Sequence, residues 1–178
     1  MAREHGIVSA LLYSLISSGV YPTESTDQYA VVEEAVEVAR LLGDRQGEIV
    51  AESFRGTVAT RERNWRVALQ SFAESAAKQF DYGETVTLMG PCWWGSFALC
   101  HLGELELAAS AMGFAAEHFP MLTDVETMAL RSEADALLRE GLGDDEVVRL
   151  KSSGAAMSTR ELVALLQEAA AAFEGDPR

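Results

Sequence analysis

Basic residues are scarce in this sequence: 14 lysines and arginines stand against 28 aspartates and glutamates, and the formal net charge is −14. Binding to nucleic acid requires a basic surface that neutralises phosphates, and this composition does not supply one. Docking on an anionic membrane surface is disfavoured for the same reason. We therefore expect neither a nucleic-acid partner nor a membrane partner for this chain.

Cysteine and lysine are also rare. Two cysteines do not make a disulfide framework, which fits a reducing, cytoplasmic location, and no signal-peptide pattern opens the chain. The only lysines, Lys78 and Lys151, do not follow a glycine-rich loop, so the phosphate-binding loop of nucleotide hydrolases is missing. The histidines and cysteines lack metal-ligand spacing, and no nucleophile elbow surrounds a serine. The sequence predicts no metal, no cofactor and no catalytic residue.

Residues 85–103 carry no charged side chain, which approaches the length of a membrane span. Gly90 and Pro91 interrupt this segment near its middle, and further glycines dilute its second half. We expect a loop followed by a helix that is buried between neighbouring helices.

Apolar residues elsewhere recur at intervals of three and four, and the alternation typical of strands is nowhere sustained. The pattern predicts an all-α protein with a single domain over residues 1–178. The expected helices cover residues 5–18, 28–42, 46–62, 65–81, 91–102, 105–119, 124–141, 144–152 and 158–173. Ser158 and Glu161 form a predicted capping box, Asn64 and Asp124 are predicted N-caps, and Gly43, Gly83 and Gly141 are predicted to end helices.

The sequence also repeats itself with a period of 40 residues. Large apolar residues share one register, at Val32, Phe72 and Met112. Small residues share two others, at Ala35, Ser75 and Ala115 and, in the preceding helix, at Gly56, Ser96 and Ala136. A helical hairpin cannot bury its own apolar face, so stacking supplies the core. We predict an α-solenoid with repeats at about 5–44, 45–84 and 85–122 and a helical cap at 123–173.

The second unit resembles a tetratricopeptide repeat at Gly56, Ala68 and Phe72, which have the small, alanine and aromatic residues of that family at its spacing. The third unit has Ser96, Ala108, Met112 and Pro120 in the matching places. The unit departs from the family in its length and in Glu52 and Arg55, which occupy the positions of the usual Trp and Leu. The resemblance implies a degenerate tetratricopeptide-like array.

A narrower resemblance covers residues 33–44, a helix and turn, and residues 154–163, near the C-terminal end. Both are similar to segments of LuxR-type and cyclase-linked actinobacterial signal-transduction ATPases, whose C-terminal halves are tetratricopeptide-like. Leu150 or Lys151 stands near a Trp of that family, so this part of its motif is only partly kept. The resemblance implies a sensing or interaction module of a bacterial transcription regulator, with nucleotide chemistry and DNA binding in other domains.

Trp93 and Trp94 form the most unusual dipeptide, because adjacent residues on a helix cannot face the same core. Either neighbouring helices bury them from two sides, or one indole lines a groove for a peptide or an apolar small molecule. The groove would include Phe97, Tyr29 and Tyr82. Arginines on the first helices of the units are either carboxylate clamps for the partner or ordinary ion-pair partners: Arg55, Arg61, Arg63 and Arg131.

The sequence thus predicts a non-catalytic module that binds a protein or peptide partner or senses a small-molecule effector. One alternative is a self-associating scaffold, a homodimer paired through an N-terminal helix with an apolar face. That face contains Ile7, Leu11, Leu12 and Leu15. Another alternative is a small-molecule hydrolase or transferase that acts through Cys92 or His101.

Overall fold

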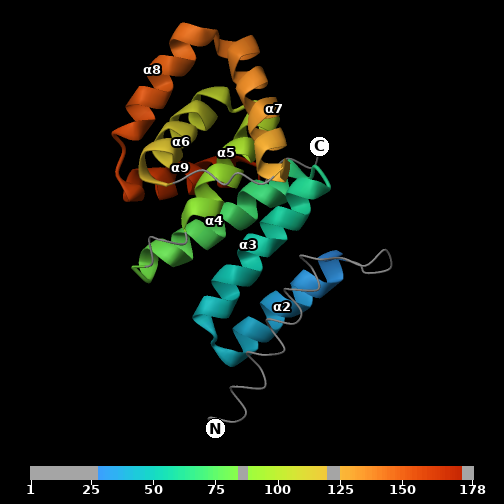
Figure 1. Ribbon diagram of the computed structural model, residues 1–178. Coiled ribbons are helices and arrows are strands. Elements are labelled where there is room, and N and C mark those ends of the chain that lie inside the picture. Colours follow the sequence, from blue (N-terminus) through green and yellow to red (C-terminus); the bar gives the residue numbers. More distant parts are fainter. Residues whose placement is uncertain (1–27, 84–87, 120–124, 174–178) are drawn as a thin grey trace.

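The computed structural model describes residues 28–83, 88–119 and 125–173, and the predicted helix at 5–18 lies outside this part of the chain. The described residues form eight helices and no strand, which confirms the all-α prediction (Figure 1). The helices are α2 (Gln28–Leu42), α3 (Arg45–Arg61), α4 (Trp65–Asp81), α5 (Met89–Leu102), α6 (Leu105–His118), α7 (Val125–Leu142), α8 (Asp144–Ala155) and α9 (Thr159–Ala172).

Local capping fixes several helix ends where the sequence predicts them. The Ser158 hydroxyl accepts from the Glu161 N–H and the Glu161 carboxylate accepts from the Ser158 N–H, which confirms the capping box of α9. Asn64 caps α4 by accepting from the Val67 N–H. Gly141 does not end α7, because the helix continues to Leu142. The glycine with positive φ that follows this helix is Gly143, with φ of 80°. The predicted cap Asp124 lies outside the described residues.

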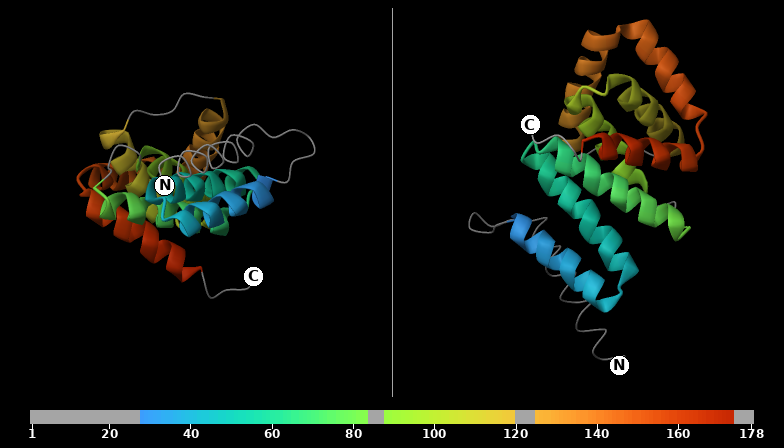
Figure 2. Two further views of the ribbon diagram at one scale, coloured as in Figure 1. Left: turned by 90° about the horizontal axis from the view of Figure 1, so that it is seen from below. Right: turned by 180° about the vertical axis from the view of Figure 1, so that it is seen from behind.

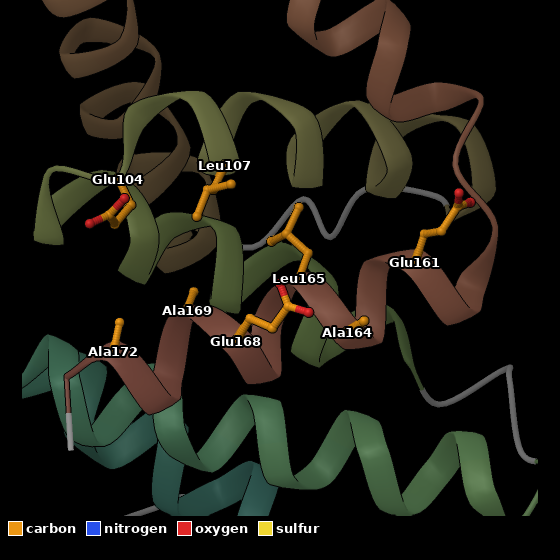
Figure 3. Close-up of a pocket in the computed structure, with 8 residues that line it drawn as sticks. All are labelled: Glu104, Leu107, Glu161, Ala164, Leu165, Glu168, Ala169 and Ala172. Atoms are coloured by element: carbon orange, nitrogen blue, oxygen red, sulfur yellow. The ribbon is translucent and has the colours of Figure 1, made fainter.

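The helices pack in sequence order from α2 to α6, and the chain then folds back (Figures 1 and 2). Helix α8 returns along α6, in the most extensive contact between any two of the described helices, and α9 packs on α4. In a regular array of hairpins the second helices of successive hairpins are neighbours. Here α9 lies between α4 and α6, so the C-terminal helices do more than cover the end of a stack (Figure 3).

One large apolar core extends from α3 to α9 and has α5 at its centre. Every residue from Pro91 to Cys100 is buried, which confirms that the uncharged segment contains a buried helix. A second, smaller cluster joins α2 to α3 through Ala35, Val36, Ala39 and Ala51. Among the described residues, no helix is both long enough and apolar enough to span a bilayer.

Small residues allow close helix contacts at several places. A β-carbon at Gly56 would lie 2.7 Å from the ring of Phe72, so a small residue of α3 faces a large one of α4. The large apolar positions of the 40-residue register, Val32, Phe72 and Met112, are all buried. The register does not extend to the last unit, because Ala136 is exposed on α7.

The contact between α6 and α8 depends on two glycines. A β-carbon on Gly113 would overlap the main-chain carbonyl of Lys151, and one on Gly154 would overlap the carbonyl of Ser110. The two backbones therefore touch at reciprocal positions. No residue with a side chain fits at either glycine unless the helices move apart.

Candidate functional site

An open groove lies between α6 and α9, with a volume of about 460 Å³ (Figure 3). Eight residues line it: Glu104, Leu107, Glu161, Ala164, Leu165, Glu168, Ala169 and Ala172. Leu107 of α6 and Leu165 of α9 point toward one another across the groove and form its apolar floor. Both are half-buried and thus accessible to a partner. We call this surface the α6–α9 groove.

The amphipathic sequence of α9 explains the groove. One face of the helix enters the core with Leu162 and Leu166, which are both 0% exposed. The next face carries Ala164, Ala169 and Ala172, whose short side chains leave space beside α6. Because α9 packs chiefly on α4 and only lightly on α6, the α6 side of this second face stays open.

Three carboxylates stand along the groove: Glu104 on the α6 side and Glu161 and Glu168 on α9. No ion pair joins any of them to an arginine or lysine within the described part of the chain. The main-chain and hydroxyl hydrogen bonds from Ser158 hold the pKa of Glu161 below its usual range, so this side chain is charged at neutral pH. The groove therefore combines an apolar floor with a negative rim.

The predicted groove residues Trp93, Trp94 and Phe97 belong to the core, where they are 2%, 7% and 0% exposed. The ring centroid of Trp94 lies 6.3 Å from that of Phe72 on α4. The ring centroids of Trp93 and Phe97 are 6.2 Å apart. The Arg131 guanidinium of α7 lies 5.8 Å from the centroid of the Trp93 ring. Neighbouring helices thus bury the two indoles from different sides, and neither indole is among the residues that line the α6–α9 groove.

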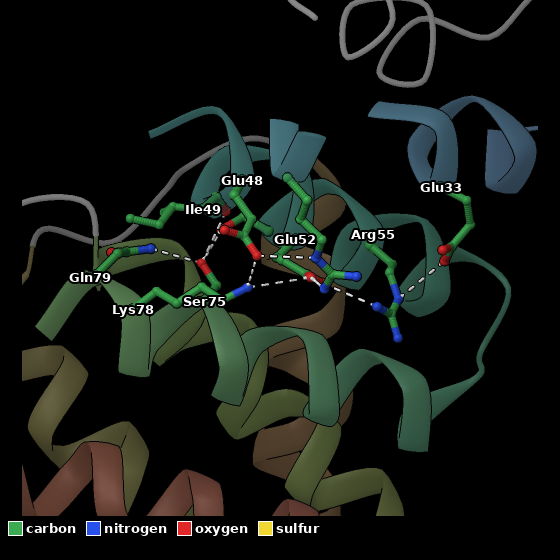
Figure 4. Close-up of polar contacts among 10 residues, drawn as sticks. Glu33, Glu48, Ile49, Glu52, Arg55, Ser75, Lys78 and Gln79 are labelled. Carbon is green, nitrogen blue, oxygen red and sulfur yellow. Dashed lines mark hydrogen bonds and ion pairs between the residues drawn. The ribbon is translucent and has the colours of Figure 1, made fainter. Parts of the chain in front are cut away.

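Among the described residues, no ring or cation–π contact joins Tyr29, Tyr82 or Arg55 to these aromatic rings, although Tyr29 packs against the same apolar core. Tyr82 lies at the end of α4, where it is 40% exposed, and the Arg45 guanidinium is 5.0 Å from its ring. Tyr29 is half-buried at the start of α2. Arg55 is engaged in ion pairs with Glu52 and Glu33 (Figure 4).

The other predicted clamp arginines also pair within the chain. Arg61 binds both carboxylate oxygens of Glu126 at 2.9 and 3.0 Å, and Arg63 binds both of Glu133 at 3.1 Å. Arg131 pairs with Asp135 one turn along α7. Each of the four arginines is thus engaged in an ion pair within the chain.

A buried carboxylate connects the first three described helices (Figure 4). Glu52 of α3 is 0% exposed and lies 2.7 Å from Arg40 Nη2, 3.2 Å from Arg55 Nη1 and 3.6 Å from Lys78 Nζ. Burial, reinforced by the nearby Glu74 carboxylate, raises the pKa of Glu52 while the three cations oppose that rise. Because Arg40 belongs to α2 and Lys78 to α4, the cluster fixes both helices on α3.

The residues of the alternative enzyme hypothesis are poorly placed for chemistry. Burial raises the pKa of the Cys100 thiol to about 12 and that of Cys92 still further, which disfavours a thiolate nucleophile. The ring of His101 stacks on Trp65 with centroids 3.9 Å apart, and burial lowers its pKa. Among the described residues, no three His, Cys, Asp or Glu side chains gather to hold a metal ion.

Sequence reasoning missed the α6–α9 groove. The sequence predicts the amphipathic helix at 158–173, but the groove depends on where that helix docks, which local periodicity does not encode. The self-association face at the N-terminus lies outside the described residues. Comparison of the chain with protein-family models, curated proteins and solved structures found no match.

Proposed function

We propose that this protein is a non-catalytic interaction module that binds a polypeptide partner in the α6–α9 groove. The observation that carries the proposal is the accessible apolar floor of Leu107 and Leu165, beside three carboxylates without an ion-pair partner in the described chain. Accessible apolar surface with a polar rim is characteristic of protein-binding sites.

The form of the groove favours a polypeptide over a small molecule. Small-molecule sites enclose most of the ligand surface. This groove has walls on two helices and follows α9, a helix of 14 residues that extends for about 20 Å. A partner of similar length would contact both walls along the groove.

The wider proposal combines the groove with the sequence resemblance. The hairpins α3–α4 and α5–α6 are proposed as tetratricopeptide-like units of a short solenoid with a helical cap, in a cytoplasmic module of a bacterial signalling regulator. Binding of a protein or effector would then favour one packing of α9 against α4 and α6 and would bias a tethered or associated domain.

Selection of helical and extended peptides from a random displayed library, with the purified protein as bait, tests the proposal. Ala164→Gln fills the groove, whereas Ala171→Gln makes the same change on an exposed position of α9 that does not line it. We expect selected peptides to lose about tenfold or more in affinity, about 1.4 kcal/mol, for the first variant and to bind the second normally. Failure to select any peptide, or equal binding to both variants, would contradict the proposal.

A further inference from the structure

We infer that the occupant of the α6–α9 groove is a basic amphipathic helix supplied by a different protein. The inference rests on the proposed function and specifies the partner. Shape, backbone chemistry and charge each contribute a separate argument.

The walls of the groove favour a helix over an extended peptide. An extended peptide satisfies its backbone N–H and C=O groups by adding to a sheet edge, and the described residues contain no strand. Both walls are helices, whose interior backbone groups already bond to one another. A helical partner brings its own backbone hydrogen bonds and needs only side-chain contacts from the groove.

The small residues set how closely such a helix can lie. Ala164, Ala169 and Ala172 present only methyl groups, so a partner helix can approach α9 more closely than a wall of larger side chains would allow. Leu107 and Leu165 then receive apolar side chains that recur every three or four residues on the partner. The apolar stripe of an amphipathic helix has this spacing.

The rim defines the charge of the partner. Glu161 and Glu168 are seven residues apart, so they lie on the same side of α9 about 10.5 Å apart along its axis. Lysine or arginine residues at i and i+7 of the partner would face both of them, and Glu104 would face a basic residue on the partner's other side. Complementary charges of this kind steer association and select between partners.

The same charges argue against a second copy of this chain as the occupant. The chain carries a net charge of −14, and its own amphipathic helix α9 would bring Glu161 and Glu168 toward the same glutamates of the other molecule. Like charges placed opposite one another across an interface cost affinity. A separate, basic partner relieves this repulsion.

Three synthetic peptides of about 16 residues, roughly 24 Å long as helices, test the inference by fluorescence anisotropy. They share one apolar Leu and Ala stripe. The first has lysines on both sides of the stripe, the second has glutamates, and the third is the lysine peptide with two prolines in its interior. We expect the first peptide to bind about tenfold or more tighter than the other two. Its affinity should decrease when the salt concentration is raised from low to moderate.

A charge-reversal variant of the protein tests the rim directly. The double variant Glu104→Lys, Glu168→Lys should lose about tenfold or more in affinity for the lysine peptide and should bind the glutamate peptide. Glu34→Lys with Glu140→Lys changes the net charge equally at exposed positions outside the groove and should leave the preference unchanged. Glu161 is kept because it caps α9.

The outcomes separate this inference from the proposed function. No binding of the lysine peptide, equal binding of the proline peptide, or an unchanged preference in the rim variant overturns the basic helix. If the library instead yields acidic or extended peptides whose binding is weakened by Ala164→Gln, the groove remains a polypeptide site and only the inference fails. If lysine-peptide binding is insensitive to Ala164→Gln, the groove is not the site and both fail.

Discussion

The reciprocal glycines of α6 and α8 lead to a quantitative prediction about stability. Gly113→Ala places a methyl group against the main-chain carbonyl of Lys151, and a helix backbone cannot turn aside as a flexible side chain can. The helices must separate, which loosens the apolar contacts along their whole interface. Overpacking costs about 1–3 kcal/mol, and an obstacle made of backbone places this case at the upper end of that range.

Alanine also favours the helical state more than glycine does, by about 1 kcal/mol. The two effects combine to a net loss of about 2 kcal/mol in the free energy of unfolding, which corresponds to a fall of about 4–8 °C in Tm for a chain of this size. Urea unfolding followed by far-ultraviolet circular dichroism measures this loss, with an unchanged dependence on denaturant as the sign that the transition is the same.

Gly95→Ala is the matched control. Gly95 lies in a helix and is buried like Gly113, but the atom nearest to its β-carbon would be a terminal methyl of the flexible Leu166 side chain at 3.3 Å, followed by the Phe72 Cβ at 3.6 Å. We expect Gly95→Ala to be no less stable than wild type, because the Leu166 methyl can shift by a few tenths of an ångström and the helical preference of alanine, about 1 kcal/mol, favours the variant.

A double variant sharpens the test. Once Gly113→Ala has separated the helices, the methyl of Gly154→Ala enters space that is already open. The double variant should therefore cost about 1 kcal/mol less than the sum of the single variants. Equal stability of Gly113→Ala and wild type, or strict additivity, would refute the proposed backbone contact.

Three further predictions concern the core, the pH dependence and one helix end. Phe72→Ala should cost about 3–5 kcal/mol in urea unfolding, because this ring is 1% exposed, whereas Tyr82→Ala should cost less than about 1 kcal/mol. Burial lowers the pKa of His101 in the folded state, so the unfolded chain binds a proton at this residue more readily as the pH falls. The stability of the fold should therefore decrease as the pH drops below about 6.5. Thermal melts across pH 5 to 8 should show a smaller decrease for His101→Gln. Arg63, two residues after α3, has φ of +56°, and glycines occupy the positive-φ positions that follow other helices: Gly43, Gly83, Gly103 and Gly143. Arg63→Gly should thus be more stable than Arg63→Ala by about 1 kcal/mol in thermal melts, and equal stability would show that the backbone there is unstrained.

Local chemistry explains what the sequence predicts well. Ser158 and Asn64 cap helices through contacts made within three residues, and the absence of charge in residues 85–103 leaves burial as the stable state for that helix. The helix class and most boundaries follow from such short-range effects. They do not require knowledge of which helices become neighbours.

Long-range packing explains what sequence reasoning missed. The dipeptide Trp93–Trp94 is compatible with a groove or with burial from two sides, and only the positions of α4 and α7 decide between them. The α6–α9 groove exists because α9 docks between α4 and α6, a contact between segments far apart in sequence. Gly113 and Gly154 have no distinctive sequence context, although they determine how closely α6 and α8 pack.

The docking of α9 on α4 joins segments far apart in the chain, and one wall of the groove depends on it. Helices α5 to α8 all lie between α4 and α9 in the chain, so closing this contact carries a larger loop-closure cost than forming any neighbouring hairpin. Until α9 arrives, one wall of the groove is missing and the apolar surface of α4 is uncovered. A partner that requires both walls would bind only molecules in which α9 is docked, and its binding would oppose undocking of this helix. Occupancy of the groove would thus report the docking of α9.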